Sequence, residues 1–356
     1  MGEKLHFASD YMEGAHPRLL QALIDTNMES VGGYGYDPFC DDARAKILVA
    51  CNCPEGEVHF LGGGTQANQV VIDALLQPWQ GVIAADSGHV NVHEAGAIEY
   101  SGHKVIAVAG ELGKLDVARV RACREAWEGD TNWEHIVEPG MVYISQPTEY
   151  GTLYSLSELE ELSAFCHEKQ MFLFEDGARL AYALACHAND VSLPDLARLC
   201  DAFYIGGTKC GALCGEAVVF PKADTAPRFF TQIKQHGALF AKGRLLGVQF
   251  GALFEDNFYA KVGRPAIEAA DKIRVALAEE GFEMPYPAPT NQVFFLADEV
   301  TIAKLDETVD YGFMETWPDG RQLVRFATSW STTSEAANQL VSLIHSLKKS
   351  GGRAQW

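Results

Sequence analysis

The stretch Ala202-Phe-Tyr-Ile-Gly-Gly-Thr-Lys-Cys-Gly-Ala-Leu-Cys-Gly-Glu-Ala-Val-Val-Phe220 decides how the rest of the chain is interpreted. Two apolar segments flank a glycine-rich turn that holds one lysine, Lys209, which predicts two buried strands joined by that turn. Burial disfavours the charged form of a lysine and lowers its pKa, and the neutral amine is a nucleophile. An ordinary exposed loop lysine is the alternative for this segment taken alone.

The residues around this stretch predict an α/β fold. Short apolar segments at 59–61, 81–85, 104–108, 141–145, 171–174 and 202–205 predict strands, and helical patterns lie between them. Apolar strands that alternate with helices are typical of a mostly parallel sheet covered on both faces. After about residue 247 a long helical region is expected to about residue 281, followed by two short strands and a terminal helix. We therefore expect a large domain over residues 1–247 and a small α/β C-terminal domain over residues 248–356.

The overall composition limits the partners. The 356 residues carry a net charge of −20, which argues against nucleic acid and anionic membranes as partners. The sequence shows no signal peptide and no apolar run long enough to span a membrane. The nine cysteines include no C-x-x-C pair, so we expect reduced thiols, no metal site and a cytoplasmic location.

A carboxylate follows another predicted strand, in Phe172-Leu-Phe-Glu-Asp176. Ligands of doubly wound sheets bind at the carboxyl ends of the strands, although Asp176 could also simply cap the next helix. Combined with Lys209 at the end of a later strand, it forms the pair that pyridoxal 5'-phosphate (PLP) requires. The lysine forms the Schiff base, and the acid keeps the pyridine nitrogen protonated. Glu175 alternates to the other side of the strand and is expected to be structural.

Two further segments are candidates for the same edge of the sheet. Gly62-Gly-Gly-Thr65-Gln66 predicts a strand, a glycine turn and a helix start, where free N–H groups and the helix dipole favour an anion. It matches neither a P-loop nor the dinucleotide fingerprint, and such turns often serve only as turns. His89, in Asp86-Ser-Gly-His89, is either a polar loop residue or an imidazole stacked on a planar cofactor.

In this order and spacing, the segments resemble the threonine aldolase and β-eliminating lyase group of fold-type I PLP enzymes, which share an aspartate-aminotransferase-like fold. The resemblance covers roughly residues 5–335 and is strongest for low-specificity L-threonine, L-allo-threonine and phenylserine aldolases. The matching stretches are Ala8-Ser-Asp10, Tyr34-Gly-Tyr-Asp-Pro38, Gly64-Thr-Gln-Ala-Asn68, Asp86-Ser-Gly-His89, His93-Glu-Ala-Gly96, Glu175-Asp-Gly-Ala-Arg179, Gly206-Gly-Thr-Lys209 and Leu323-Val-Arg-Phe326.

The resemblance implies a role for each matching residue. Lys209 would carry the cofactor, Asp176 would bind its pyridine nitrogen and His89 would stack on its ring. The residues implied to bind PLP are Gly64, Thr65, Gln66, His89, Asp176, Arg179, Lys209 and, from a neighbouring subunit, Arg244. The residues implied to bind the amino acid substrate are Ser9, Tyr34, Arg179 and Arg325, with Ser9 and Arg325 on its carboxylate. Tyr34 and His135 match positions near a subunit interface, so a homo-oligomer is expected.

The implied reaction is retro-aldol cleavage of a β-hydroxy-α-amino acid to glycine and an aldehyde, with His89 or His135 as the base. A β-eliminating lyase and a glycine-transferring transaldolase are alternatives on the same cofactor. A non-catalytic binding protein of this fold is a more distant one. Two departures from the family leave the substrate and the reaction open: Thr148-Glu-Tyr150 replaces Thr-His-Asn, and Thr208-Lys-Cys210-Gly replaces Ser-Lys-Gly.

Overall fold

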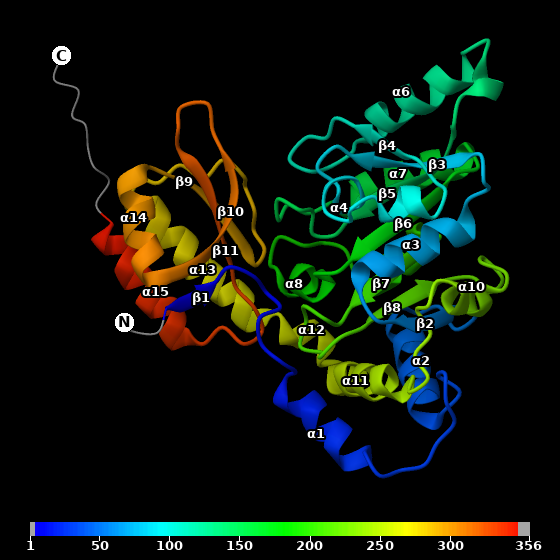
Figure 1. The fold of residues 1–356 in the computed structure, drawn as a ribbon, viewed down its shortest axis with the longest axis horizontal. Helices are drawn as coiled ribbons and strands as arrows, with labels where there is room; N and C mark the ends of the chain where they lie inside the picture. Colours follow the sequence, from blue (N-terminus) through cyan, green and yellow to red (C-terminus); the bar gives the residue numbers. More distant parts are fainter. Residues whose placement is uncertain (1–3, 348–356) are drawn as a thin grey trace.

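The computed structural model describes residues 4–347, which form two sheets with their covering helices (Figure 1). Within these residues the larger sheet has seven strands in the order β2-β8-β7-β6-β5-β3-β4. They are β2 (Glu57–Leu61), β3 (Gln80–Ala85), β4 (Val105–Val108), β5 (Glu138–Ser145), β6 (Phe172–Gly177), β7 (Ala202–Gly206) and β8 (Glu216–Phe220). Neighbours are parallel except that β8 runs antiparallel to β7 and β2. The expected mostly parallel sheet is confirmed.

Helices cover both faces of this sheet, because successive strand residues point to opposite sides. In β5, Val142 and Ile144 enter one core, whereas Met141 and Tyr143 enter the other. The first core is covered by α2 (Pro38–Ala50), α6 (Val117–Glu128), α7 (Leu156–Glu168), α9 (Leu193–Leu199) and α11 (Arg244–Phe254). The second is covered by α3 (Gly64–Leu75), α5 (Ala97–Tyr100) and α10 (Phe229–Gln235).

The smaller sheet has the order β1-β10-β11-β9. Its strands are β1 (Leu5–Phe7), β9 (Gln292–Ala297), β10 (Val309–Thr316) and β11 (Gln322–Ala327). They share a core with α13 (Arg264–Glu279), α14 (Glu299–Thr308) and α15 (Ser334–Ser346). β1 pairs in parallel with β10, so the expected division at residue 247 is wrong for this strand, which belongs to the smaller sheet.

The helical region between the sheets is broken rather than continuous. It consists of α11, a 3-10 turn η2 (Glu255–Asn257), α12 (Tyr259–Val262) and α13. Asp256 and Asn257 both have φ of 55°, a left-handed conformation that ends a right-handed helix. Pro265 then lies in the first turn of α13, where its missing N–H costs nothing.

The remaining helices are short or lie near the edges of the sheets. They are α1 (Pro17–Thr26), α4 (His89–Val92), η1 (Trp133–His135) and α8 (Leu180–Ala185). Among the helices of the described chain, none combines the length and the apolar character that crossing a membrane requires.

Candidate active site

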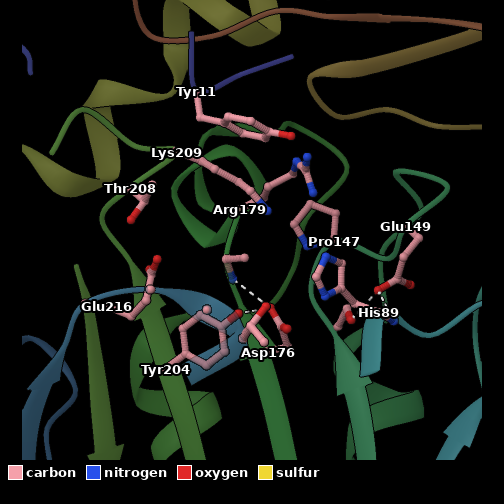
Figure 2. A pocket seen from close by; sticks show the side chains of 16 residues that line it. Tyr11, His89, Pro147, Glu149, Asp176, Arg179, Tyr204, Thr208, Lys209 and Glu216 are labelled. Carbon is pink, nitrogen blue, oxygen red and sulfur yellow. Dashed lines mark hydrogen bonds between the residues drawn. The ribbon is translucent and has the colours of Figure 1, made fainter. Parts of the chain in front are cut away.

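A cavity of about 310 Å³ opens at the carboxyl edge of the larger sheet (Figure 2). Its lining comes from the ends of β5, β6 and β7, from the start of β8, and from the turns before α3 and α4. The lining residues are Tyr11, Gly62, Gly63, Gly64, Thr65, His89, Ser145, Pro147, Glu149, Asp176, Ala178, Arg179, Tyr204, Thr208, Lys209 and Glu216. The strand ends therefore bring Lys209 and Asp176 to one cavity.

Asp176 is held by four donors of its own chain. Its Oδ1 accepts hydrogen bonds from the Tyr204 hydroxyl at 2.5 Å and from the Ala178 N–H at 3.0 Å. Its Oδ2 accepts from the Tyr143 hydroxyl at 2.6 Å and from the Asn68 amide at 3.0 Å. Burial opposes ionisation, yet the charge of His89 and these hydrogen bonds keep the pKa of Asp176 below its usual value. An ionised carboxylate therefore lines the cavity.

His89 is linked to Asp176 through a chain of hydrogen bonds. His89 Nδ1 lies 2.7 Å from Glu94 Oε1, which also accepts from the Asn68 amide at 2.7 Å. Burial lowers the pKa of His89, but the hydrogen bond to Glu94 and the charge of Asp176 outweigh it, so the net shift is upward. The arrangement fixes the plane of the imidazole ring beside the cavity.

The glycine turn before α3 leaves backbone N–H donors at the cavity. The helix begins at Gly64, and the N–H groups of its first turn have no acceptor within the helix. A Cβ added to Gly63 would meet nothing within 4 Å, although the extended backbone there suits any residue. The absence of a side chain at Gly63 therefore leaves this part of the cavity open to a ligand. Gln66 closes the turn, because its Oε1 accepts from the Gly62 N–H at 3.1 Å.

Lys209 lies on a tight turn between β7 and β8. The N–H groups of Cys210 and Ala212 both bond to the Gly207 carbonyl, and the Tyr182 hydroxyl donates to the Lys209 carbonyl at 2.5 Å. Gly211 has φ of 101°, which a residue with a side chain rarely adopts. Burial, followed by the nearby charge of Arg179, lowers the pKa of the Lys209 amine. The expected buried, reactive lysine is consistent with this environment.

We call Ser9, Arg179 and Arg325 the arginine wall. Arg179 also lines the cavity, and it binds Asp10 through Nε at 2.7 Å and Nη2 at 3.1 Å. Asp10 also accepts a hydrogen bond from the side-chain amide of Asn291, which immediately precedes β9. A residue next to the smaller sheet therefore helps to fix this ion pair. Arg325 extends from β11 and donates to the Ala8 carbonyl and the Gln292 side chain. Neighbouring charges of Arg179 and Asp10 act on Arg325, which shows that the groups lie close together.

Two polar atoms of the arginine wall are buried without a partner in the described chain: the Ser9 hydroxyl oxygen and Arg325 Nε. Buried polar groups are normally hydrogen-bonded, and an unpaired one costs about 1–3 kcal/mol. Such groups are tolerated where a ligand completes them. The chemistry of this pair, a guanidinium and a hydroxyl, suits a carboxylate.

Six expected site residues are not part of the cavity's lining. Gln66 bonds to the lining residue Gly62, Ser9 and Arg325 belong to the arginine wall, and the other three lie away from the cavity in this chain. His135 is exposed in η1, just before the amino end of β5, and therefore lies at the opposite edge of the sheet. His135 does not reach the cavity of its own chain, and its expected role as a base across a subunit interface stays a prediction. Tyr34 stacks with Lys234 instead, and Arg244 donates to the carbonyls of Thr26 and Glu29 after α1.

Several residues of the site were not expected from the sequence. Tyr143 and Tyr204 lie on strands next to β6, and Tyr204 pairs directly with Asp176 in the parallel register. The sequence did contain a signal for them, because each is a residue with a hydroxyl group in an otherwise apolar strand. The others are Asp10, Tyr11, Asn68, Glu94, Glu149 and Glu216; of these, Asp10, Asn68 and Glu94 belong to stretches that match the family.

The residues present fit PLP. The cavity combines a lysine with a lowered pKa, an ionised carboxylate and an anion-ready turn that a Cβ at Gly63 would narrow. The arginine wall, of which Arg179 lines the cavity, adds two unpaired groups suited to a carboxylate. These are the groups that fold-type I enzymes direct at the pyridine nitrogen, the phosphate and the amino acid.

The fold and this site define a fold-type I enzyme of the lyase class. The family model for beta-eliminating lyases matches residues 6–300. The chain belongs to the beta-eliminating lyase family. Aspartate aminotransferase of Thermus thermophilus has the same fold, with a TM-score of 0.70 at 16% identity over 97% of this chain and 91% of the other.

Within the family, the similarity is to threonine aldolases. The low-specificity L-threonine aldolase of Pseudomonas aeruginosa is 31% identical over 94% of this chain and 95% of the relative. The solved structure of Leishmania major threonine aldolase has a TM-score of 0.93 at 40% identity, over 97% of this chain and 99% of the other. The sequence-based assignment to this family is confirmed.

Proposed function

We propose that this chain is a PLP-dependent aldolase that cleaves β-hydroxy-α-amino acids, of the threonine, allo-threonine or phenylserine type, to glycine and an aldehyde. The observation that carries the proposal is that Lys209, Asp176 and Arg179 line one cavity. The unpaired Ser9 hydroxyl and Arg325 Nε belong to the arginine wall, which reaches this cavity through Arg179. The threonine aldolases to which the chain is similar support the choice of reaction.

When bound, PLP supplies an electron sink for the bonds at the substrate's Cα. Lys209 would hold it covalently, Asp176 would balance the charge of its ring nitrogen, and His89 would support its ring. The N–H groups of Gly64, Thr65 and Gln66 would hold the phosphate. Contacts within the chain already fix the positions of Asp176, His89 and Gln66.

The arginine wall would orient the substrate. Arg325 and Ser9 would hold its carboxylate at two points, and two-point fixation sets the rotation about the bond between the amine nitrogen and Cα. The bond held perpendicular to the cofactor plane is the one that breaks. Arg179 would support either the carboxylate or the cofactor's phenolic oxygen, because Asp10 fixes its direction.

We propose a homo-oligomer that completes the site. Among the cavity-lining residues of the described chain, the basic side chains are Lys209, Arg179 and His89, and none of them lies on the glycine turn. A partner's cation would balance the phosphate there, which keeps Arg244 and Tyr34 as candidates from a neighbouring subunit. The nine cysteines are all free, which supports the cytoplasmic location we propose.

Product analysis tests the proposal. The protein is loaded with PLP and incubated with L-threonine, L-allo-threonine and phenylserine. We expect glycine with acetaldehyde or benzaldehyde. Release of 2-oxobutyrate and ammonia from threonine would favour β-elimination instead, and consumption of an amino acid only in the presence of a second aldehyde would favour transaldolase activity. Absence of any turnover across the panel would leave the binding-protein alternative.

A further inference from the structure

The loop after β5 places one carboxylate between two cavities. Glu149 lines the site cavity and also a neighbouring cavity of about 340 Å³. The second cavity lies between the large sheet's loops and the smaller sheet, with His93 on one side and Leu323 on the other. Figure 2 shows Glu149 beside His89 at the edge of the site.

The second cavity lies where the substrate's side chain is expected. Leu323 and Arg325 alternate to the same face of β11, and the charge of Arg325 acts on His93. An amino acid whose carboxylate is held by Arg325 therefore has the second cavity within reach of its side chain. Glu149 lines both cavities, so it lies beside the path from the substrate's Cα to its side chain. The β-hydroxyl of a β-hydroxy-α-amino acid is expected on this path.

The carboxylate of Glu149 is fixed through one oxygen. Its Oε1 accepts hydrogen bonds from the backbone N–H of His89 at 3.0 Å and from the Ser145 hydroxyl at 2.8 Å. These donors leave Oε2 as the oxygen that a ligand can reach. Burial raises the pKa of Glu149, with a further contribution from the negative charge of Asp176. A raised pKa makes a carboxylate a stronger proton acceptor.

The two histidines considered from the sequence are less suitable as bases. His89 Nδ1 is bonded to Glu94, and the net upward shift of the His89 pKa favours the protonated ring, which has no free lone pair. His135 lies at the opposite edge of the sheet in its own chain. Among the residues that line these two cavities, Glu149 is the one that lines both, so its carboxylate lies at their junction.

We propose that Glu149 is the general base of the aldol cleavage, an inference that rests on the function proposed above. Its Oε2 accepts the β-hydroxyl proton while the O–H electron pair forms the second bond of the aldehyde carbonyl. The Cα–Cβ bond breaks, and its electron pair stays on Cα, stabilised by the cofactor. Cα then takes up one proton to give glycine, so protons balance and no further reactant is consumed.

The substitution Glu149→Gln tests this role, because glutamine keeps the acceptor for His89 and Ser145 but is not a base. We expect kcat for aldehyde release to fall about a hundredfold to a thousandfold. The visible spectrum of the bound cofactor should be unchanged, and so should exchange of the α-proton of glycine with solvent, followed by NMR in D₂O. Glu149→Asp should recover part of kcat. Glu168→Gln, which removes an exposed carboxylate at the end of α7 that lines neither cavity, is the matched control and should leave kcat unchanged.

A pH profile separates a base from a residue that only shapes the site. The acidic limb of kcat/KM in the wild type should disappear in Glu149→Gln. The other groups facing Glu149 that can contribute are Asp176, Arg179 and His89 in the site, and Asp86, His93 and Glu315 in the second cavity. A retained acidic limb would assign the titration to one of these and overturn the proposal.

The outcomes distinguish this inference from the proposed function. Glu149→Gln with aldehyde release near the wild-type rate, or with equal losses in aldehyde release and glycine exchange, overturns the role of Glu149 alone. A wild-type protein that releases no aldehyde from any substrate of the panel overturns the proposed function, and this inference fails with it.

Discussion

The two walls of the site differ in how completely the chain satisfies them. On the large sheet, Asp176 has four hydrogen-bond donors, two on each oxygen. On the arginine wall, Ser9 Oγ and Arg325 Nε are buried and have no hydrogen-bond partner among residues 4–347. The first region is preorganised by its own residues, whereas the second leaves groups for a ligand to complete. The difference implies that substitutions on the sheet side impair the cofactor's chemistry, and substitutions on the arginine wall impair binding of the amino acid.

The largest effect is expected for Lys209→Ala. Removal of the covalent anchor should lower turnover at least about a thousandfold, since groups that act as one catalytic unit are lost together. The visible absorbance of the bound cofactor should be lost as well. Lys222→Ala, an exposed lysine just after β8, is the control and should leave both the rate and the spectrum unchanged. An unchanged spectrum in Lys209→Ala would contradict its role.

Glu216 tests whether every carboxylate on the large-sheet wall of the site is stabilised in its ionised form, as Asp176 is. Burial raises the pKa of Glu216 from 4.5 to about 7. The folded state therefore holds this proton more tightly than the unfolded chain, so stability falls as the pH rises from 4.5 to about 7. Glu216→Gln removes this loss, and above pH 7 the variant should be more stable by about 3 kcal/mol.

Urea unfolding of the apoproteins at pH 5 and pH 8 measures this difference. The gain should be small at pH 5 and nearly complete at pH 8. Glu268→Gln, at an exposed site on α13, should change the free energy of unfolding by less than about 0.5 kcal/mol at either pH. Equal effects of Glu216→Gln at both pH values would show that the carboxyl group does not titrate in this range.

Arg325→Ala tests the arginine wall. Loss of a charge-assisted hydrogen bond costs about 1.5–3 kcal/mol, so KM should rise about tenfold to a hundredfold while the cofactor spectrum is retained. Arg321→Ala, which removes an exposed arginine bonded to Asp319 and Glu283, should leave KM unchanged. A normal KM in Arg325→Ala would move the carboxylate site elsewhere.

The smallest effect is expected for Ser9→Ala. A neutral hydroxyl contributes about 1 kcal/mol to binding, so KM should rise about fivefold. Because the hydroxyl is unpaired in the chain itself, the apoprotein should be no less stable than the wild type. Ser342→Ala, on the exposed face of α15, is the control. A destabilised apoprotein with a normal KM would make Ser9 a structural residue.

Strand ends made the centre of the site predictable from the sequence. Lys209 and Asp176 follow apolar strands, and parallel strands bring their carboxyl ends to one edge whatever their order. The position of Glu175 was predictable for the same reason, since alternation sends it to the opposite face, where both its oxygens are buried and unpaired. Periodicity was enough for these residues.

Contacts between distant segments were not predictable. The ion pair of Asp10 and Arg179 joins residues 169 positions apart, and β1 is a strand of three residues whose partner lies on β10. No local pattern encodes such pairings, because they depend on how the two sheets meet. His135 precedes a strand, so the fold places it at the edge of the sheet opposite the cavity of its own chain; its expected approach across a subunit interface stays a prediction.

Covalent fixation of the cofactor tests the central claim most directly. The protein is loaded with PLP, reduced with borohydride to fix the cofactor to its lysine, digested and mapped by mass spectrometry. The account predicts a modified peptide that contains Lys209, in wild-type protein and in Arg325→Ala alike. Modification of a different lysine, or none in a protein that has retained PLP, would contradict the assignment of this cavity as the active site.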